Sequence, residues 1–325
     1  MSQPATLAIT TLSDIRSAAE VIRPVIARTP LVPLHDYAAR SSILLKPEIL
    51  QPVNSFKLRG IYYAVARLTD ARRAAGISTV SAGNTAQALA WCGRHFGIPA
   101  RSVMPETAPR SKIEAVRAYG GEPVLVPGPE VFRYLREHGW EDEPYSFVHP
   151  WLNPHVHAGY GSIALEIIED CPEVEAVYVP VGGGGLITGV GGAMKQLRPE
   201  ARIIAAEPEG CPSLHASIKA GRAMTVECRT ICDGVAVPYI TDELFPVLRE
   251  IVDECVLVSE EDVKAMVRRL ALRNKMVVEP SGALAAAAAV AAASDQGAES
   301  RGTSVAIVTG GSIDAEKFIA ILNES

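Results

Sequence analysis

The chain has 325 residues, 48% of them hydrophobic, a net charge of -6 and a pI near 5.7. This hydrophobic content can bury a large core, which excludes a disordered chain, and the length fits one large α/β unit or two coupled domains. The acidic balance supplies no basic field, so we expect no nucleic-acid partner and no attraction to an anionic membrane.

The cysteines and apolar runs exclude further classes. None of the six cysteines forms a CxxC pair, and the closest two, Cys228 and Cys232, lack the second pair that completes a zinc site. We therefore expect reduced cysteines. Residues 1–12 lack the basic start and apolar core of a secretory signal, and the run Ala283 to Ala293 is too short to span a bilayer. These features predict a cytoplasmic protein without a membrane partner, in which the alanine-rich run is a buried helix.

Short β-branched runs alternate with helical patterns along most of the chain, as is typical of helices packed on a largely parallel sheet. The predicted strands, in chain order, are Ile43–Lys46, Ile77–Ser81, Arg101–Met104, Pro123–Val126, Ala176–Pro180, Arg202–Ala206 and Ser304–Val308. The predicted helices include Asn84–Phe96 with an asparagine cap, Arg110–Tyr119 before two glycines, and Glu260–Asn274 behind a Ser259 cap.

The spacing of these elements predicts two domains. Three compact strand–helix units lie between about Gly76 and Asn153, and the later half restarts with its own glycine-rich turn after Val181. We therefore expect a small domain, residues 76–153, inserted in a large discontinuous domain of residues 1–75 and 154–325.

A buried strand runs directly into a four-glycine turn, Gly182, Gly183, Gly184 and Gly185, followed by Leu186 and a helical pattern. Glycines there let backbone N–H groups converge on an anion at a helix N-terminus, so a phosphate is the natural ligand. The spacing satisfies neither G-x-G-x-x-G nor a Walker motif. The alternative is a tight strand–helix turn without a ligand.

Two further strand-to-helix junctions carry polar groups. Ser81, Gly83, Asn84 and Thr85 offer N–H groups and side chains that could hold a substrate carboxylate, the alternative being a helix cap by Asn84. Thr309 ends an apolar strand, where its hydroxyl could meet a ring nitrogen. Because ligands of open α/β sheets bind at the carboxyl ends of strands, the three junctions predict one shared site.

One lysine, Lys57, lies between Phe56 and a helical pattern. Most lysines are solvated surface charges, which is the alternative for this one. Together with three glycine-rich turns, however, a lysine beside an aromatic ring indicates a pyridoxal 5'-phosphate site. A lysine attacks the cofactor's aldehyde only when neutral, and a partly dry site lowers its basicity toward working pH.

Over nearly its whole length, the chain resembles the serine/threonine dehydratase group of the fold-type II, or tryptophan synthase β-like, pyridoxal phosphate enzymes. The motifs that carry the resemblance are Ser-Phe-Lys-Leu-Arg-Gly at 55–60, Ser-Ala-Gly-Asn at 81–84, the four-glycine loop, Glu-Pro-Glu-Gly at 207–210, Asp-Gly at 233–234, Glu-Pro-Ser-Gly at 279–282 and Thr-Gly-Gly at 309–311. The resemblance implies two open, mostly parallel twisted sheets flanked by helices, with a small domain inserted in a large one, and a homodimer.

It also implies roles for individual residues. Lys57 is the lysine that forms the Schiff base, Phe56 flanks the ring, and Asn84 bonds to the ring hydroxyl. Gly182 to Gly185 and Leu186 surround the phosphate. Thr309 is the partner of the pyridine nitrogen, and because a hydroxyl cannot protonate that nitrogen, the ring is a weaker electron sink that favours prompt loss of a β-hydroxyl.

Several positions depart from the dehydratase pattern. Ala82 stands where serine racemases have a serine that acts as acid/base, which favours elimination over racemisation. Thr85 replaces the usual histidine and makes the segment similar to cysteine synthases. Trp151 and its neighbours replace the more acidic His-Pro-Phe-Asp-Asp segment. These changes either alter which β-hydroxy amino acid fits or lie outside the pocket.

Many relatives bind a divalent cation through a glutamate and an aspartate a few residues later. Glu207 is present, but Ser213 occupies the aspartate position. We therefore doubt a cation site, and Glu207 can equally be a structural carboxylate.

The residues and the resemblance together predict an ammonia-lyase that acts on a small amino acid. It would convert an L-β-hydroxy amino acid, L-threonine or L-serine, to a 2-oxo acid and ammonia by α,β-elimination. The alternatives are a serine racemase, a hydroxyaspartate dehydratase-like activity, a β-replacement enzyme and a non-catalytic carrier.

Overall fold

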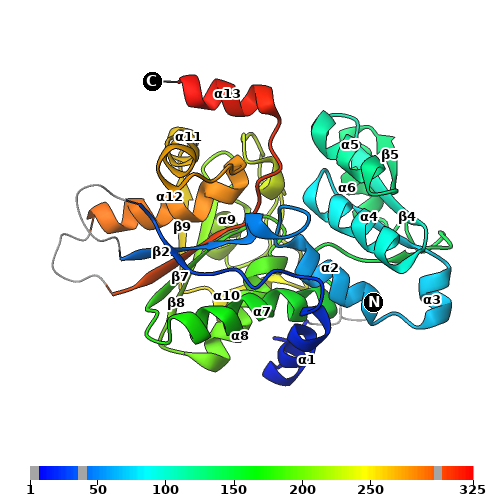
Figure 1. Cartoon of the computed structure of the whole chain (residues 1–325), viewed down its shortest axis with the longest axis horizontal. Coiled ribbons are helices and arrows are strands. Elements are labelled where there is room, and N and C mark those ends of the chain that lie inside the picture. Colours follow the sequence, from blue (N-terminus) through cyan, green and yellow to red (C-terminus); the bar gives the residue numbers. More distant parts are fainter. Residues whose placement is uncertain (1–6, 36–41, 296–301, 325) are drawn as a thin grey trace.

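The computed structural model describes residues 7–35, 42–295 and 302–324. They form a six-stranded and a four-stranded sheet, each flanked by helices (Figure 1). This confirms the predicted α/β class with two largely parallel sheets.

The six-stranded sheet has the order β1-β2-β10-β7-β8-β9, and every neighbouring pair except β1 and β2 is parallel. Its strands are β1 (Val32–Pro33), β2 (Ile43–Pro47), β7 (Ala176–Pro180), β8 (Arg202–Pro208), β9 (Glu254–Val258) and β10 (Ser304–Val308). In the sheet, Ser304 of β10 pairs with Ile43 on one side and Ala176 on the other. Segments far apart in the sequence therefore end side by side.

Helices cover both faces of this sheet. One face carries α1 (Leu12–Ile22), α2 (Lys57–Ala66), α7 (Pro154–Asp170), α8 (Gly185–Leu197) and α10 (Phe245–Ile251), and the other carries α11 (Glu260–Arg269), α12 (Pro280–Asp295) and α13 (Ala315–Asn323). Val305 and Ile307 of β10 join the first core, whereas Ala306 and Val308 join the second. Burial on both faces explains why the strands are almost continuously apolar.

The four-stranded sheet is parallel throughout, in the order β5-β4-β3-β6. Its elements are β3 (Ile77–Val80), β4 (Ala100–Pro105), β5 (Glu122–Val126), β6 (Ser146–Phe147), α4 (Asn84–Phe96), α5 (Arg110–Ala118) and α6 (Gly128–Arg136), preceded by α3 (Asp70–Ala74). Figure 1 shows α4, α5 and α6 gathered to one side of the larger sheet. The exact domain limits at 76 and 153 stay a prediction.

The predicted elements match the observed ones closely, with differences at short or edge elements. Helix Asn84–Phe96 has the predicted bounds. The predicted helix Glu260–Asn274 is an α-helix only as far as Arg269, and its last five residues, Leu270–Asn274, form a π-helical turn. Strands β1, β6 and β9 are not predicted, since the first two span two residues each and β9 lies at the sheet edge. The remaining short helical turns are Glu48–Leu50 and Asp233–Val235.

The alanine-rich run forms part of α12, where residues 283–289 are buried. This confirms the expected buried helix. Within the described residues, no helix has both the length and the hydropathy needed to cross a bilayer.

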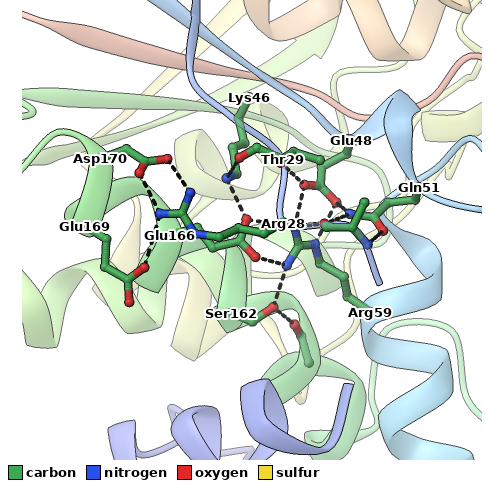
Figure 2. Close-up of polar contacts among 12 residues, drawn as sticks. Arg28, Thr29, Lys46, Glu48, Gln51, Arg59, Ser162, Glu166, Glu169 and Asp170 are labelled. Atoms are coloured by element: carbon green, nitrogen blue, oxygen red, sulfur yellow. Dashed lines mark hydrogen bonds and ion pairs between the residues drawn. The ribbon is translucent and has the colours of Figure 1, made fainter. Parts of the chain in front are cut away.

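A buried ion network fixes the start of α2 (Figure 2). The fully buried Arg59 donates to both carboxylate oxygens of Glu48 over 2.7 and 2.8 Å, and to both of Glu166 over 2.7 and 2.9 Å. Lys46 donates to Glu166 over 2.6 Å. Burial lowers the pKa of Arg59, but the two carboxylates outweigh this effect and raise it. Because Arg59 lies in the first turn of α2, the network fixes the position of this helix, whose first residue is Lys57.

Two cysteines contradict the expectation of reduced thiols. Cys211 and Cys228 form a disulfide. The loop between them folds back so that the N–H of Arg229 donates to the carbonyl of Gly210 over 2.7 Å, which places the sulfurs opposite each other. A separation of 17 residues hides this pairing from any search for short cysteine motifs.

Candidate active site

A cavity of about 370 Å³ lies where the carboxyl ends of strands from both sheets face each other. Ser81 follows β3, Gly182 follows β7 and Thr309 follows β10. Every residue predicted to bind cofactor or substrate lines this cavity: Phe56, Lys57, Ser81, Gly83, Asn84, Thr85, Gly182, Gly183, Gly184, Gly185, Leu186 and Thr309. The fold therefore brings the three junctions and the lysine together, as the strand-end argument requires.

Lys57 is the first residue of α2 and projects toward the ring of Phe56. Its Nζ lies 4.7 Å from the centroid of that ring, and the ring packs edge-on against Tyr160. Burial lowers the pKa of Lys57 to about 8, although the charge of Glu279 opposes the shift. A much larger fraction of this amine is therefore neutral near pH 7 than in an ordinary lysine, and only the neutral form is a nucleophile or proton acceptor.

The glycine loop forms an open cradle at the N-terminus of α8. Gly184 adopts a φ of +90°, which favours glycine. A Cβ at Gly182 would lie 2.9 Å from the backbone of Val235, and one at Gly183 would lie 2.4 Å from the ring of Trp151. Only glycine therefore lets Val235 and Trp151 pack directly against the loop, which leads into the N-terminus of α8, where N–H groups and the helix dipole favour an anion.

Asn84 does not cap α4, so the cap suggested by the sequence is wrong. The N-cap is Gly83, and no side chain caps the helix there. Instead, the amide of Asn84 donates to Glu279 Oε1 over 2.5 Å, because the carboxylate reaches into the cavity from the opposite sheet. The N–H of Gly83 donates to Ser81 Oγ over 3.1 Å, which fixes the turn.

Thr309 lies at the floor of the cavity and is buried. Its hydroxyl donates to the carbonyl of Ser281 over 3.3 Å, and its own carbonyl accepts the N–H of Phe56 over 3.1 Å. The second bond ties the end of β10 to the residue before Lys57. The two hydrogen bonds of Thr309 thus fix its hydroxyl and also fix the backbone next to Lys57.

An ion cluster that sequence reasoning missed joins the two sheets across the cavity. Lys112 of α5 donates to Asp233 over 2.7 Å and to Glu279 over 2.9 Å. Burial lowers the pKa of Lys112, but the two carboxylates outweigh burial and raise it above the ordinary value. A sequence signal existed: Lys112 shares the buried face of α5 with Ile113 and Val116, where an unpaired lysine is rare.

Glu207 lies outside this cavity. Its two carboxylate oxygens accept the N–H groups of Leu214 and His215, at the start of α9 (Ser213–Ala220), over 2.7 and 2.8 Å. Burial raises the pKa of Glu207. In the described part of the chain, His, Cys, Asp and Glu side chains form no group of three that could hold a metal ion.

The fold and the cavity define a class: an α/β protein with a lysine of lowered pKa beside an anion cradle, at the carboxyl ends of parallel strands. Residues 22–310 match the family model described as "Pyridoxal-phosphate dependent enzyme". The L-threonine ammonia-lyase of Thermotoga maritima is 40% identical over 97% of this chain and 78% of its own length.

Solved structures agree with this match. Maize serine racemase superposes with a TM-score of 0.88 and 31% identity, covering 96% of this chain and 97% of that one. The processed form of threonine deaminase isoform 2 from Solanum lycopersicum superposes with a TM-score of 0.85 and 32% identity, covering 98% and 96%. The chain belongs to the pyridoxal-phosphate-dependent enzyme family. The resemblance to its serine/threonine dehydratase group, predicted from the motifs, is confirmed.

Proposed function

We propose that this protein is a pyridoxal phosphate-dependent ammonia-lyase that converts an L-β-hydroxy amino acid to a 2-oxo acid and ammonia. The proposal rests on one observation: Lys57, whose pKa is lowered to about 8, and the glycine loop line the same cavity. The similarity to the L-threonine ammonia-lyase of Thermotoga maritima supports threonine or serine as the first substrates to test.

The cavity fits the cofactor, because the glycine loop at the N-terminus of α8, the buried amine of Lys57 and the hydroxyl of Thr309 all line it. In the proposal, the N–H groups of Gly182 to Gly185 and Leu186 bind the phosphate. Phe56 packs against the ring, Asn84 faces the ring hydroxyl and Thr309 faces the ring nitrogen.

The proposal places the substrate carboxylate at Ser81, Gly83, Asn84 and Thr85, where backbone N–H groups and hydroxyls line the start of α4. When bound, the cofactor withdraws electrons from Cα and makes its hydrogen acidic. Lys57 Nζ then accepts the Cα proton, and the β-hydroxyl leaves as water. Water hydrolyses the unsaturated product to the 2-oxo acid and ammonia.

Elimination is favoured over racemisation by the chemistry of the lining. Racemisation requires a second acid/base on the face opposite Lys57, and Ala82 lines the cavity with a methyl group instead. The Thr309 hydroxyl is also no proton donor comparable to a carboxylic acid.

The direct test is to incubate the purified holoenzyme with L-threonine, L-serine and a panel of other hydroxy amino acids. We expect release of 2-oxo acid and ammonia, with little or no D-enantiomer and no thiol-dependent product. D-amino acid without oxo acid would support a racemase, and a thiol adduct would support β-replacement. Absence of turnover would support a non-catalytic carrier.

Cation dependence can be tested separately. Because both oxygens of Glu207 already accept backbone N–H groups, we propose that turnover does not require a divalent cation. Dialysis against EDTA should change kcat/KM by less than about twofold. A larger loss that Mg²⁺ or Ca²⁺ restores would contradict this proposal.

A homodimer and a cytoplasmic location remain proposals. The first rests on the family resemblance, and sedimentation and localisation experiments test both.

A further inference from the structure

The cavity has a polar side and an apolar side. The polar groups lie at the strand ends and at the start of α4, as described above. The same cavity is also lined by a group of side chains that we call the apolar wall, made of Val131, Phe132 and Leu135 of α6, Trp151, Ala236 and Val237. These six residues come from three separate segments and present no charged group.

Aromatic contacts connect the segments of the apolar wall. The Phe132 ring lies 6.0 Å from that of Tyr239, edge to face, and the Trp151 ring lies 6.3 Å from the same tyrosine. Trp151 is further held against Gly183, since a Cβ there would touch its indole. Tyr239 therefore connects the Phe132 and Trp151 rings of the apolar wall, so that contacts within the protein hold both rings in place.

Phe132 is the residue of the apolar wall that is most available to a ligand. It is only partly buried and belongs to none of the hydrophobic core clusters of the described residues, whereas Val131 and Leu135 beside it do. Its ring faces the cavity instead. A partly exposed aromatic ring that lines a concave site is a usual means of binding an apolar ligand group.

The charges in the lining argue against a second acidic group on the substrate. The charged lining residues are Lys57, Lys112, Asp233 and Glu279. Lys112 already pairs with both carboxylates, and Lys57 is committed to the reaction in the proposed function. A substrate such as 3-hydroxyaspartate would bring another carboxylate toward Asp233 and Glu279 without a cation to pair with it.

We propose that the preferred substrate carries a bulky apolar group on Cβ, an aryl ring above all, so that the enzyme acts on β-aryl-β-hydroxy amino acids such as L-threo-phenylserine. This inference rests on the proposed function and specifies its substrate class. The methyl of threonine or the hydrogen of serine would leave the exposed parts of Phe132 and Trp151 in contact with water, whereas a phenyl ring could cover them.

The reaction balances without an oxidant or reductant. The Cα–H and Cβ–OH bonds break and one water leaves. One water returns when the unsaturated amine is hydrolysed, so phenylserine gives phenylpyruvate and ammonia. The aryl ring takes no part in the bond changes, and the apolar wall acts by binding alone.

The test compares kcat/KM of the holoenzyme for L-threo-phenylserine, L-threonine and L-serine. We expect phenylserine to exceed threonine by at least about tenfold. The Phe132→Ala variant should lose at least about tenfold on phenylserine and less than about threefold on threonine. Phe318→Ala is the matched control, because Phe318 is also partly buried but packs against the core of the large sheet away from the cavity. It should leave the substrate ratio unchanged.

A binding measurement separates recognition from chemistry. L-Phenylalanine and L-2-aminobutyrate lack the hydroxyl, so they report binding of the aryl and methyl groups as competitive inhibitors. Phenylalanine should inhibit more strongly, and Phe132→Ala should remove its advantage.

Threonine turnover that exceeds phenylserine turnover, or an equal loss on both substrates in Phe132→Ala, would overturn the aryl preference and leave the ammonia-lyase standing. Failure of every substrate to release oxo acid would overturn the proposed function, and the aryl preference with it.

Discussion

Replacing Lys57 by alanine should reduce 2-oxo acid release by about 10³-fold or more, since the group that takes the Cα proton is removed. The visible absorbance of the bound cofactor should also disappear. In the parent enzyme, borohydride reduction followed by peptide mass analysis should place a pyridoxyl group on Lys57. Release of 2-oxo acid and absorbance are the two measurements.

Lys219→Ala is the control for this experiment, because Lys219 is exposed at the end of α9, far from the cavity lining. It should retain full activity. A pyridoxyl group on any other lysine, or oxo acid release by Lys57→Ala near the parent level, would refute the role of Lys57.

The pH dependence of cofactor attachment follows from the same amine. Burial lowers the pKa of Lys57 to about 8, and only the neutral form attacks an aldehyde. The neutral fraction of Lys57 increases with pH and saturates above the pKa. The rate at which the cofactor attaches to the apoenzyme should therefore increase with pH up to about 8 and stay constant at higher pH. An ordinary surface lysine would keep accelerating up to about pH 10.

The second large effect is on stability. Arg59→Met should lower the free energy of unfolding by about 3–5 kcal/mol, because it leaves Glu48 and Glu166 buried without the guanidinium that pairs with both. Denaturant titration monitored by circular dichroism measures the change. The hydrophobic replacement keeps much of the side-chain volume, so the loss reports the stranded charges.

Arg28→Met is the matched control, because Arg28 forms a separate, exposed pair of ion pairs beside the Arg59 network (Figure 2). Arg28 pairs with Glu169 and Asp170, but its side chain is 51% exposed. The same substitution there should cost only about 0–1 kcal/mol. Equal losses in the two variants would mean that burial does not set the strength of this network.

Much of the fold could be predicted from the sequence because its signals are local. Strand β10, for example, is an apolar run that ends at Thr309, and Gly184 marks a turn that needs a positive φ. Lys57 and the glycine loop could be placed in one site by a topological rule, since parallel strands end at one edge of a sheet.

The residues that sequence reasoning missed depend on contacts between distant segments. Lys112 and Glu279 are 167 positions apart, and the pairing shows only when the two sheets face each other. The same holds for the Cys211–Cys228 disulfide and for Asn84, whose amide turns from its own helix to Glu279. Local propensity favours a cap at Asn84, but a buried carboxylate nearby outweighs it.

The Lys112 cluster has a consequence for how the two lobes move. Its ammonium comes from α5 of the smaller sheet, and the carboxylates of Asp233 and Glu279 come from the larger part of the chain. Pulling the two sheets apart would separate Lys112 from both carboxylates, so the cluster opposes a wide opening of the cavity. Because Lys112 and Glu279 are shielded from solvent, dissolved ions screen this attraction weakly, and the spacing of the lobes should hardly vary with ionic strength.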